Sequence, residues 1–215
     1  MIVAIFSDVH ANLPAMQQFI EVTRSVADVY VCLGDVVNYG PWNDECLELV
    51  AQLPGIIYLK GNHEDYFLDQ KLLKNEPPLV RIFYEHSIRF FSRKNLITNL
   101  PGSYLLEKYL CAHTIGNQRI YKDTDIEIDR DHMIGHSHHQ FVIERSGRKI
   151  ISPGSIGQKR DQIDKINYAL FDTGTGEIEL CEQDYDFDSF CNELVAREYP
   201  LGCIEYYTNK KARRP

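Results

Sequence analysis

The chain has 215 residues, of which 44% are hydrophobic and 25% charged, and these proportions are typical of a globular protein of about one domain. Its longest apolar run, residues 1–6, is far short of the ~20 residues that span a bilayer and has no basic leader, so we expect a cytoplasmic protein without a membrane segment. With 23 basic and 31 acidic side chains the net charge is −8, which disfavours a binder of long nucleic acids because such binding depends on Lys and Arg.

The first third of the chain alternates short β-rich runs with amphipathic segments. Helical spacing of apolar residues follows Asn12, and it recurs after Asn43 or Asp44, either of which can cap a helix. Strand–helix–strand order with short connections predicts right-handed parallel crossovers, which are typical of an α/β sheet. The predicted strands cover residues 2–6, 29–33 and 56–59, and the helix faces comprise Met16, Phe19, Ile20 and Thr23, then Cys46, Leu47, Val50 and Ala51.

The middle of the chain, up to Pro101-Gly102, is predicted to be mainly helical, and the part after it contains short strands again. We expect those strands to form a second sheet, mixed or antiparallel. We also expect one domain over residues 1–208 and a flexible, basic tail over residues 209–215. The later strands cover residues 109–112, 133–134, 141–144, 149–151, 166–171 and 178–181, and a last helix carries Phe187, Phe190, Cys191 and Leu194.

Side chains that can bind a metal recur where predicted strands end. Because the carboxyl ends of the strands in an open α/β sheet line one crevice, we expect these side chains to converge there. They are Asp8 and His10 after the first strand, Asp35 after the second, Asn62 and His63 after the third, His113 after residues 109–112, and His136 and His138 after residues 133–134.

This set supplies carboxylates, an amide and imidazoles but no thiolate. Mixed nitrogen and oxygen ligands suit Mn, Fe, Zn, Ni or Co, and they argue against a closed cysteine zinc site. Seven candidate ligands, with His63 in reserve, exceed what one ion needs, whereas two divalent ions that share a carboxylate account for them. Asp35 is central among the strands and is the expected bridge. Two-metal centres are typical of phosphoester hydrolysis.

The order and spacing of these blocks resemble the calcineurin-like metallophosphoesterases over residues 1–172. The matching motifs are Asp8-x-His10, Gly34-Asp35-x4-Gly40, Gly61-Asn62-His63-Glu64, His113 and Gly135-His136-x-His138. The resemblance implies a mixed α/β fold, a four-layer αββα sandwich in which two mixed sheets are flanked by helices. It also implies these roles: Asp8, His10, Asp35 and His138 hold one ion, Asp35, Asn62, His113 and His136 hold the other, and His63 is catalytic.

A later segment resembles particular members of this family, and the residues at two positions differ from those of related families. Residues 152–160, SPGSIGQKR, resemble the small single-domain bacterial and archaeal members. Residues 34–41 are also similar to symmetrical dinucleoside tetraphosphate hydrolases and serine/threonine protein phosphatases, which have arginine in place of Tyr39; the protein phosphatases have another in place of Lys60. Arginine binds phosphate through a planar fork that neither Tyr nor Lys can copy, which disfavours protein-phosphatase activity.

We therefore expect a metal-dependent phosphoesterase acting on a small phosphodiester or phosphomonoester, with manganese as the first candidate metal. Water between two ions loses a proton near neutral pH, and the hydroxide would attack phosphorus in line with the leaving oxygen. His63 is the candidate proton donor to that oxygen. The alternatives are a catalytically inactive protein-binding scaffold on the same fold, or a nuclease of the same superfamily, which the acidic composition disfavours.

Three residues are candidate substrate contacts, and each has a structural alternative. Asn12 is either a helix cap or a partner of the metal site. Tyr39 could stack a nucleobase or pack locally, and Arg160 could anchor a substrate phosphate or be a solvated charge.

Overall fold

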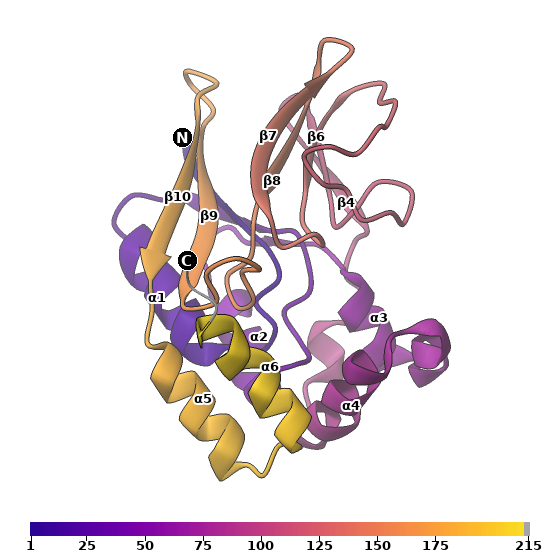
Figure 1. Cartoon of the computed structure of the whole chain (residues 1–215). Helices are drawn as coiled ribbons and strands as arrows, with labels where there is room; N and C mark the ends of the chain where they lie inside the picture. The colour runs from indigo at the N-terminus through magenta and orange to yellow at the C-terminus, as the bar shows by residue number, and fades with distance from the viewer. Residues whose placement is uncertain (213–215) are drawn as a thin grey trace.

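Two five-stranded sheets lie face to face in the computed structural model, which describes residues 1–212 (Figure 1). In sheet A, β1, β2 and β3 run parallel to one another, as the alternation of strands and helices predicts. The order in sheet A is β10 (Ile178–Asp184), β9 (Lys165–Asp172), β1 (Ile2–Phe6), β2 (Val29–Cys32) and β3 (Ile57–Tyr58). The order in sheet B is β4 (Ser103–Leu106), β5 (Tyr109–Ala112), β6 (Asp131–Ile134), β8 (Arg148–Pro153) and β7 (Gln140–Arg145).

β9 and β10 complete sheet A, whereas the sequence pattern placed them in the second sheet. β9 pairs antiparallel with β1, with Ile5 opposite Ala169, and β10 pairs antiparallel with β9. The physical reason is that β1 is central and buried, so the backbone groups on the edge away from β2 need a partner. That partner comes from far along the chain, where no local pattern marks the pairing.

Sheet B is mixed as well, since β5, β6 and β8 are parallel while β4 and β7 pair antiparallel at its edges. β4 is absent from the predicted strands. Three of its four residues are exposed, so its sequence has no apolar alternation to reveal a strand.

Both helices predicted in the first third are present. The second begins directly after Trp42, so Asn43 and Asp44 lie in its first turn instead of capping it. Asn43 Oδ1 accepts a hydrogen bond from Asn38 N at 2.8 Å and thereby holds the preceding loop. The helices are α1 (Leu13–Thr23), α2 (Asn43–Ala51), α3 (Asn62–Leu68), α4 (Pro78–Ser87), α5 (Phe187–Ala196) and α6 (Leu201–Ala212), with 3₁₀ turns η1 (Gln70–Asn75), η2 (Ile88–Phe90) and η3 (Lys94–Leu96).

The sheets divide the apolar core into layers. β1 shows this directly: Val3 and Ile5 point between the sheets, whereas Ala4 and Phe6 pack towards the helices that cover the other face of sheet A (Figure 1). The expected pair of mixed sheets flanked by helices is confirmed. On the outer face of sheet B, the cover is the irregular chain between β5 and β6, which contributes Ile115, Ile126 and Ile128.

The helix predicted around Phe187 is present as α5, and it is followed by a further helix, α6, that the sequence did not predict. α6 continues to Ala212, so residues 209–212 are helical, and residues 213–215 of the expected tail lie outside the described residues. Tyr207 holds this helix, because its ring lies 4.7 Å from that of Phe190 on α5 and its hydroxyl accepts a bond from Gln158 Nε2. None of the helices within residues 1–212 has the length and hydrophobicity needed to cross a bilayer.

Candidate metal centre

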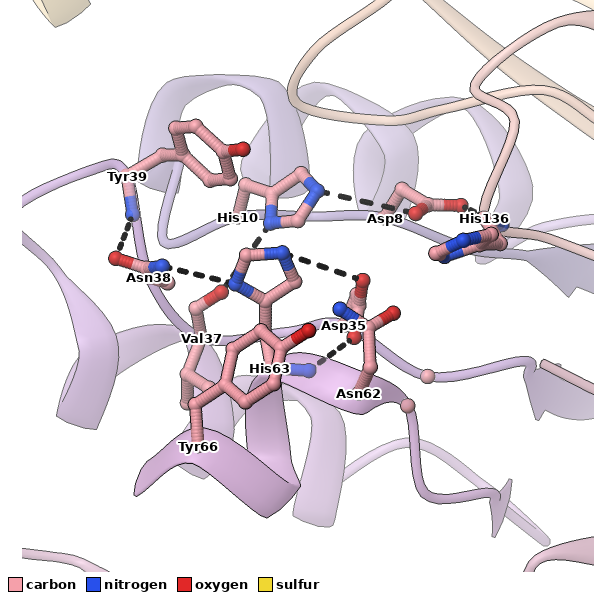
Figure 2. A network of polar contacts seen from close by, with 12 residues as sticks. Asp8, His10, Asp35, Val37, Asn38, Tyr39, Asn62, His63, Tyr66 and His136 are labelled. Atoms are coloured by element: carbon pink, nitrogen blue, oxygen red, sulfur yellow. Dashed lines mark hydrogen bonds and ion pairs between the residues drawn. The ribbon is translucent and has the colours of Figure 1, made fainter. Parts of the chain in front are cut away.

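The side chains that the sequence predicts after five strands lie together at one edge of the two sheets. Figure 2 shows part of this cluster. The ligand atoms form three groups, each within 4.8 Å: Asp8, His10 and His138; Asp35, His113 and His136; and His10, Asp35 and His63. Asn62 joins the second group, with Oδ1 3.0 Å from His113 Nε2. Every predicted ligand is therefore in this cluster, and the first two groups each combine residues that follow strands of both sheets.

The backbone that carries these side chains is unusual. Asp8, His10, Asp35, His136 and His138 have φ between 51° and 67°, in the left-handed region that residues other than glycine rarely adopt. Backbone strain of this kind is concentrated at functional sites.

In the first group, three hydrogen-bond acceptors face one another. His10 and His138 each donate Nδ1–H to a backbone carbonyl, that of Val37 at 3.2 Å and that of Gln158 at 2.9 Å, which leaves Nε2 as the lone-pair atom. The two Nε2 atoms lie 3.2 Å apart, and Asp8 Oδ1, which has no hydrogen-bond partner among the described residues, lies 3.2 Å from His138 Nε2. Lone pairs that face one another in a buried site are stabilised by a cation, and these donors fit a divalent transition metal.

The pKa values of this group agree with that conclusion. Burial is the main cause that lowers the pKa of His10 and His138 well below the ordinary value, so both rings are neutral. Burial also raises the pKa of Asp8 to about 7, since no nearby positive charge compensates its carboxylate fully. A bound cation would supply the missing charge.

The second group is built around Asp35. Asp35 Oδ2 lies 3.1 Å from His113 Nε2, and Asn62 Oδ1 and His136 Nδ1 lie 3.0 and 3.2 Å from the same nitrogen. His113 Nδ1 donates to the carbonyl of Leu33 at 2.8 Å, which directs Nε2 into the group. Burial opposes the charge on His113, but the attraction of Asp35 outweighs it and raises the pKa of His113 to about 10. A proton on Nε2 thus occupies the position that a divalent cation fits.

His63 approaches from the first turn of α3 and differs from the ligands (Figure 2). Its Nδ1 accepts a hydrogen bond from Asn38 Nδ2 at 2.8 Å, and the amide is oriented because Asn38 Oδ1 accepts from Tyr39 N at 2.7 Å. This network assigns the proton of the neutral ring to Nε2, which lies 3.8 Å from Asp35 Oδ2. His63 therefore presents a donor to the centre.

Glu64 shapes the centre, although the sequence motif alone gave it no role. Its fully buried carboxylate accepts hydrogen bonds from Asp35 N and Gly61 N, both at 2.8 Å, and from Val36 N at 2.7 Å. These bonds tie the loop after β2 to the start of α3. The available signal is the spacing Gly61-x-x-Glu64, because a glutamate in the first helical turn can reach back to the residue before the helix.

Two glycines leave room for the carboxylates. A Cβ atom on Gly61 would overlap the Asp35 carboxylate, and one on Gly135 would overlap Ser7 Oγ and lie 2.9 Å from Asp8 Oδ2. Any larger residue at either position would therefore displace a predicted metal ligand.

Asn12 caps α1, which is one of the two roles expected for it. Its side chain is fully buried, and Oδ1 caps α1 by accepting from Ala15 N at 3.2 Å. Its Nδ2 donates to the carbonyl of Gly157 at 3.1 Å and to the Tyr185 hydroxyl at 3.0 Å. Because each polar atom of the amide is used inside the protein, the cap interpretation is the correct one.

The other two candidate substrate residues, Tyr39 and Arg160, have different surroundings. The Tyr39 ring is 7% exposed and lies 4.7 Å from the ring of His10 and 5.2 Å from that of His63, so it packs over the cluster. Arg160 is half-buried, and its Nη1 donates a hydrogen bond to the Tyr206 hydroxyl.

The fold and this cluster define a metal-binding α/β protein. The family model described as calcineurin-like phosphoesterase matches residues 1–187, and the chain belongs to this family of metal-dependent phosphoesterases. An uncharacterised protein of Methanocaldococcus jannaschii is 27% identical over an alignment of 241 positions, gaps included. The alignment covers 92% of this chain and 93% of that one.

Solved structures with low sequence identity share the fold. A metallophosphoesterase from Sphaerobacter thermophilus is 24% identical, with a TM-score of 0.78 over 98% of this chain and 99% of that chain. A hypothetical protein from Pyrococcus horikoshii is 16% identical, with a TM-score of 0.79 over 96% and 97% of the two chains. These likenesses extend over nearly the whole of each chain, as expected for one shared architecture.

Proposed function

We propose that the chain hydrolyses a small phosphoester, diester or monoester, at a centre of two divalent ions, with manganese as the resident metal and the cytoplasm as its location. The observation that carries this proposal is the convergence of buried acceptor atoms with no proton between them, above all His10 Nε2 and His138 Nε2 at 3.2 Å. Asp8, His10, Asp35 and His138 would hold one ion, and Asp35, Asn62, His113 and His136 the other. Asp35, which lies in two of the three groups, would bridge them.

When bound, the ions would supply positive charge to the phosphoryl oxygens and lower the pKa of the attacking water. The chain provides the groups around that reaction. Backbone carbonyls hold the imidazoles of His10, His113 and His138 in one orientation, so their Nε2 atoms are preorganised. His63, held by Asn38, directs Nε2–H towards the centre, where it would hydrogen-bond a phosphoryl oxygen and stabilise its charge; after gaining a second proton the ring would donate one to the leaving oxygen.

Hydrolysis of bis-p-nitrophenyl phosphate by purified, manganese-loaded protein tests the proposal, with His63→Ala as the matched control. We expect kcat of this variant to fall by about 10² to 10⁴ while its metal content, measured by elemental analysis, stays near that of the wild type. An unchanged rate would remove His63 from the mechanism.

The same assay separates the remaining alternatives. Inactivity of the wild type with Mn, Fe, Zn, Ni and Co would favour a protein-binding scaffold on this fold. Cleavage of oligonucleotides that decreases steeply with salt would favour a nuclease.

A further inference from the structure

Two cationic side chains lie next to each other near the metal centre. Arg160 belongs to the segment that joins β8 to β9, and Lys210 lies near the end of α6. Both contact Tyr206: Arg160 Nη1 donates to its hydroxyl, and Lys210 Nζ lies 4.5 Å from its ring centroid. Figure 1 shows the end of α6 beside the chain between β8 and β9.

Neither cation takes part in an ion pair within the described part of the chain, although this acidic protein has many carboxylates. Neighbouring lysines are neutralised: Lys159 pairs with Glu182, and Lys211, the next residue on α6, pairs with Asp188. Burial, then the charge of Arg160, lowers the pKa of Lys210 to about 8. The fold therefore keeps two positive charges together without a counterion, which is unfavourable until an anion binds.

This cationic pair is connected to the metal centre on two sides. The carbonyl of Gln158, two residues before Arg160, accepts the hydrogen bond from His138 Nδ1, and after burial the Arg160 charge is the next cause that lowers the pKa of His138. On the other side, the Phe83 ring lies 5.8 Å from Tyr206 and 4.8 Å from Tyr39, whose ring packs on His10. The rings of Tyr206, Phe83 and Tyr39 thus form a continuous contact between the pair and His10.

We propose that Arg160 and Lys210, with the Tyr206 hydroxyl, form a second anion subsite, and that the substrate is a small phosphoester that carries a second phosphate group. This inference rests on the proposed function, in which the first phosphate binds at the metal centre. A planar guanidinium can bind two phosphate oxygens at once, and the ammonium adds a second charge-assisted donor.

Two chromogenic esters that differ by one phosphate test the subsite: the p-nitrophenyl ester of thymidine 5′-phosphate, and the same compound with a 3′-phosphate. Both release p-nitrophenolate, so the ratio of their kcat/KM values isolates the second phosphate. We expect the 3′-phosphate to raise kcat/KM by about tenfold or more, and Arg160→Met or Lys210→Met to reduce this ratio by about tenfold. Lys211→Met, the neighbouring lysine with its own partner, should keep the ratio of the wild type. A ratio near one in the wild type, or a ratio that neither substitution changes, overturns the subsite.

A binding measurement decides the inference even if the chain is not an esterase. Isothermal titration of the manganese-loaded protein with 1,5-pentanebisphosphonate, whose two phosphonates are joined by five carbons and cannot be hydrolysed, should give a Kd that Arg160→Met and Lys210→Met weaken by about tenfold. Inorganic phosphate is the single-anion comparison, and its Kd should change less. Equal changes for both anions, or no change, overturn the subsite. Failure of the proposed function would instead appear as no hydrolysis of either ester or of bis-p-nitrophenyl phosphate by the wild type.

Discussion

At the scale of single residues, Asp35 has the central position. Its carboxylate shares a group with His113 and His136 and another with His10 and His63, and its Oδ1 also accepts a hydrogen bond from His63 N at 2.8 Å. The attraction of His113 and His63 outweighs burial and holds the pKa of Asp35 below its ordinary value, so the carboxylate is charged. Both proposed ion positions would therefore depend on this residue.

Asp35→Ala should therefore lose both ions, whereas Asp8→Ala should lose only the ion held with His10 and His138. Elemental analysis of the purified variants, with circular dichroism as a check on folding, measures this difference. A folded Asp35→Ala protein that retains both ions would contradict the bridging role.

The sequence could predict which side chains converge in this cluster, but not all of the residues that hold them in position. Asp8, Asp35 and His113 each follow an apolar run, so local pattern and strand topology together bring them to one place. Asn38 bonds the ring of His63, and Glu64 bonds the backbone N–H of Asp35. These partners are distant in the sequence, so the residues beside Asn38 and Glu64 give no sign of them. Asn12 combines both cases, since its role as a cap has a local signal, whereas its bonds to Gly157 and Tyr185 do not.

At the scale of elements, Glu64 joins the loop after β2 to the first turn of α3. Both of its carboxylate oxygens accept hydrogen bonds from buried backbone N–H groups. The side-chain NH₂ of a glutamine at this position would face those N–H groups, and two donors cannot bond each other. Glu64→Gln should lower the free energy of unfolding by about 2 to 4 kcal/mol, as expected for disrupting a buried, charge-assisted network.

Denaturant unfolding of the wild type and of Glu64→Gln measures this loss of unfolding free energy. Glu76→Gln is the matched control, because Glu76 accepts one bond, from the Tyr66 hydroxyl, and lies at a less buried position. Equal stability of Glu64→Gln and Glu76→Gln would contradict the role assigned to the Glu64 carboxylate.

On α6, the lowered pKa of Lys210 predicts how stability depends on pH. Burial and Arg160 disfavour the charged amine in the folded state, so its charge lowers the stability of the fold. This cost is fully present below about pH 8 and disappears as pH rises towards the ordinary lysine pKa of 10.5. Lys210→Met should therefore have a higher Tm than the wild type at about pH 7, and the difference should shrink towards pH 10.

Thermal unfolding across this pH range tests the prediction. Lys211→Met serves as the control and should show no such gain, because Lys211 has Asp188 as its partner. A Tm difference for Lys210→Met that is constant with pH would show that the charge of Lys210 is not its cause.

Elements with local signals were predictable, and elements fixed by distant contacts were not. α1 has a cap and an apolar face within its own sequence. The end of α6 has only lysines and polar residues there, and it is helical because Tyr206 and Tyr207 are held by the segment around Gln158 and Arg160. β9 was recognised as a strand, but its partner, β1, lies at the other end of the chain.

At the scale of the whole molecule, each ion would have ligands from both sheets: Asp8 and His10 follow β1 of sheet A, and His138 follows β6 of sheet B. Metal binding should thus stabilise the entire fold. At a free metal concentration 100 times Kd, one ion contributes about 2.7 kcal/mol, which corresponds to about 5–10 °C in Tm for a chain of this size.

Removal of both metal ions with a chelator should lower the Tm by at least the amount given for one ion, as differential scanning calorimetry can measure. His63→Ala should show the same decrease, whereas Asp35→Ala should show none. An unchanged Tm in the wild type would mean that the buried acceptors do not hold an ion in solution.

The division of the ligands between the sheets also has a consequence for biogenesis. Synthesis begins at the N-terminus, and a nascent chain that ends before His138 lacks a ligand for one ion, while one that ends before His136 completes neither position. Metal binding would consequently occur late in synthesis, after most of the polypeptide has left the ribosome. It would require that strands of both sheets have already come together.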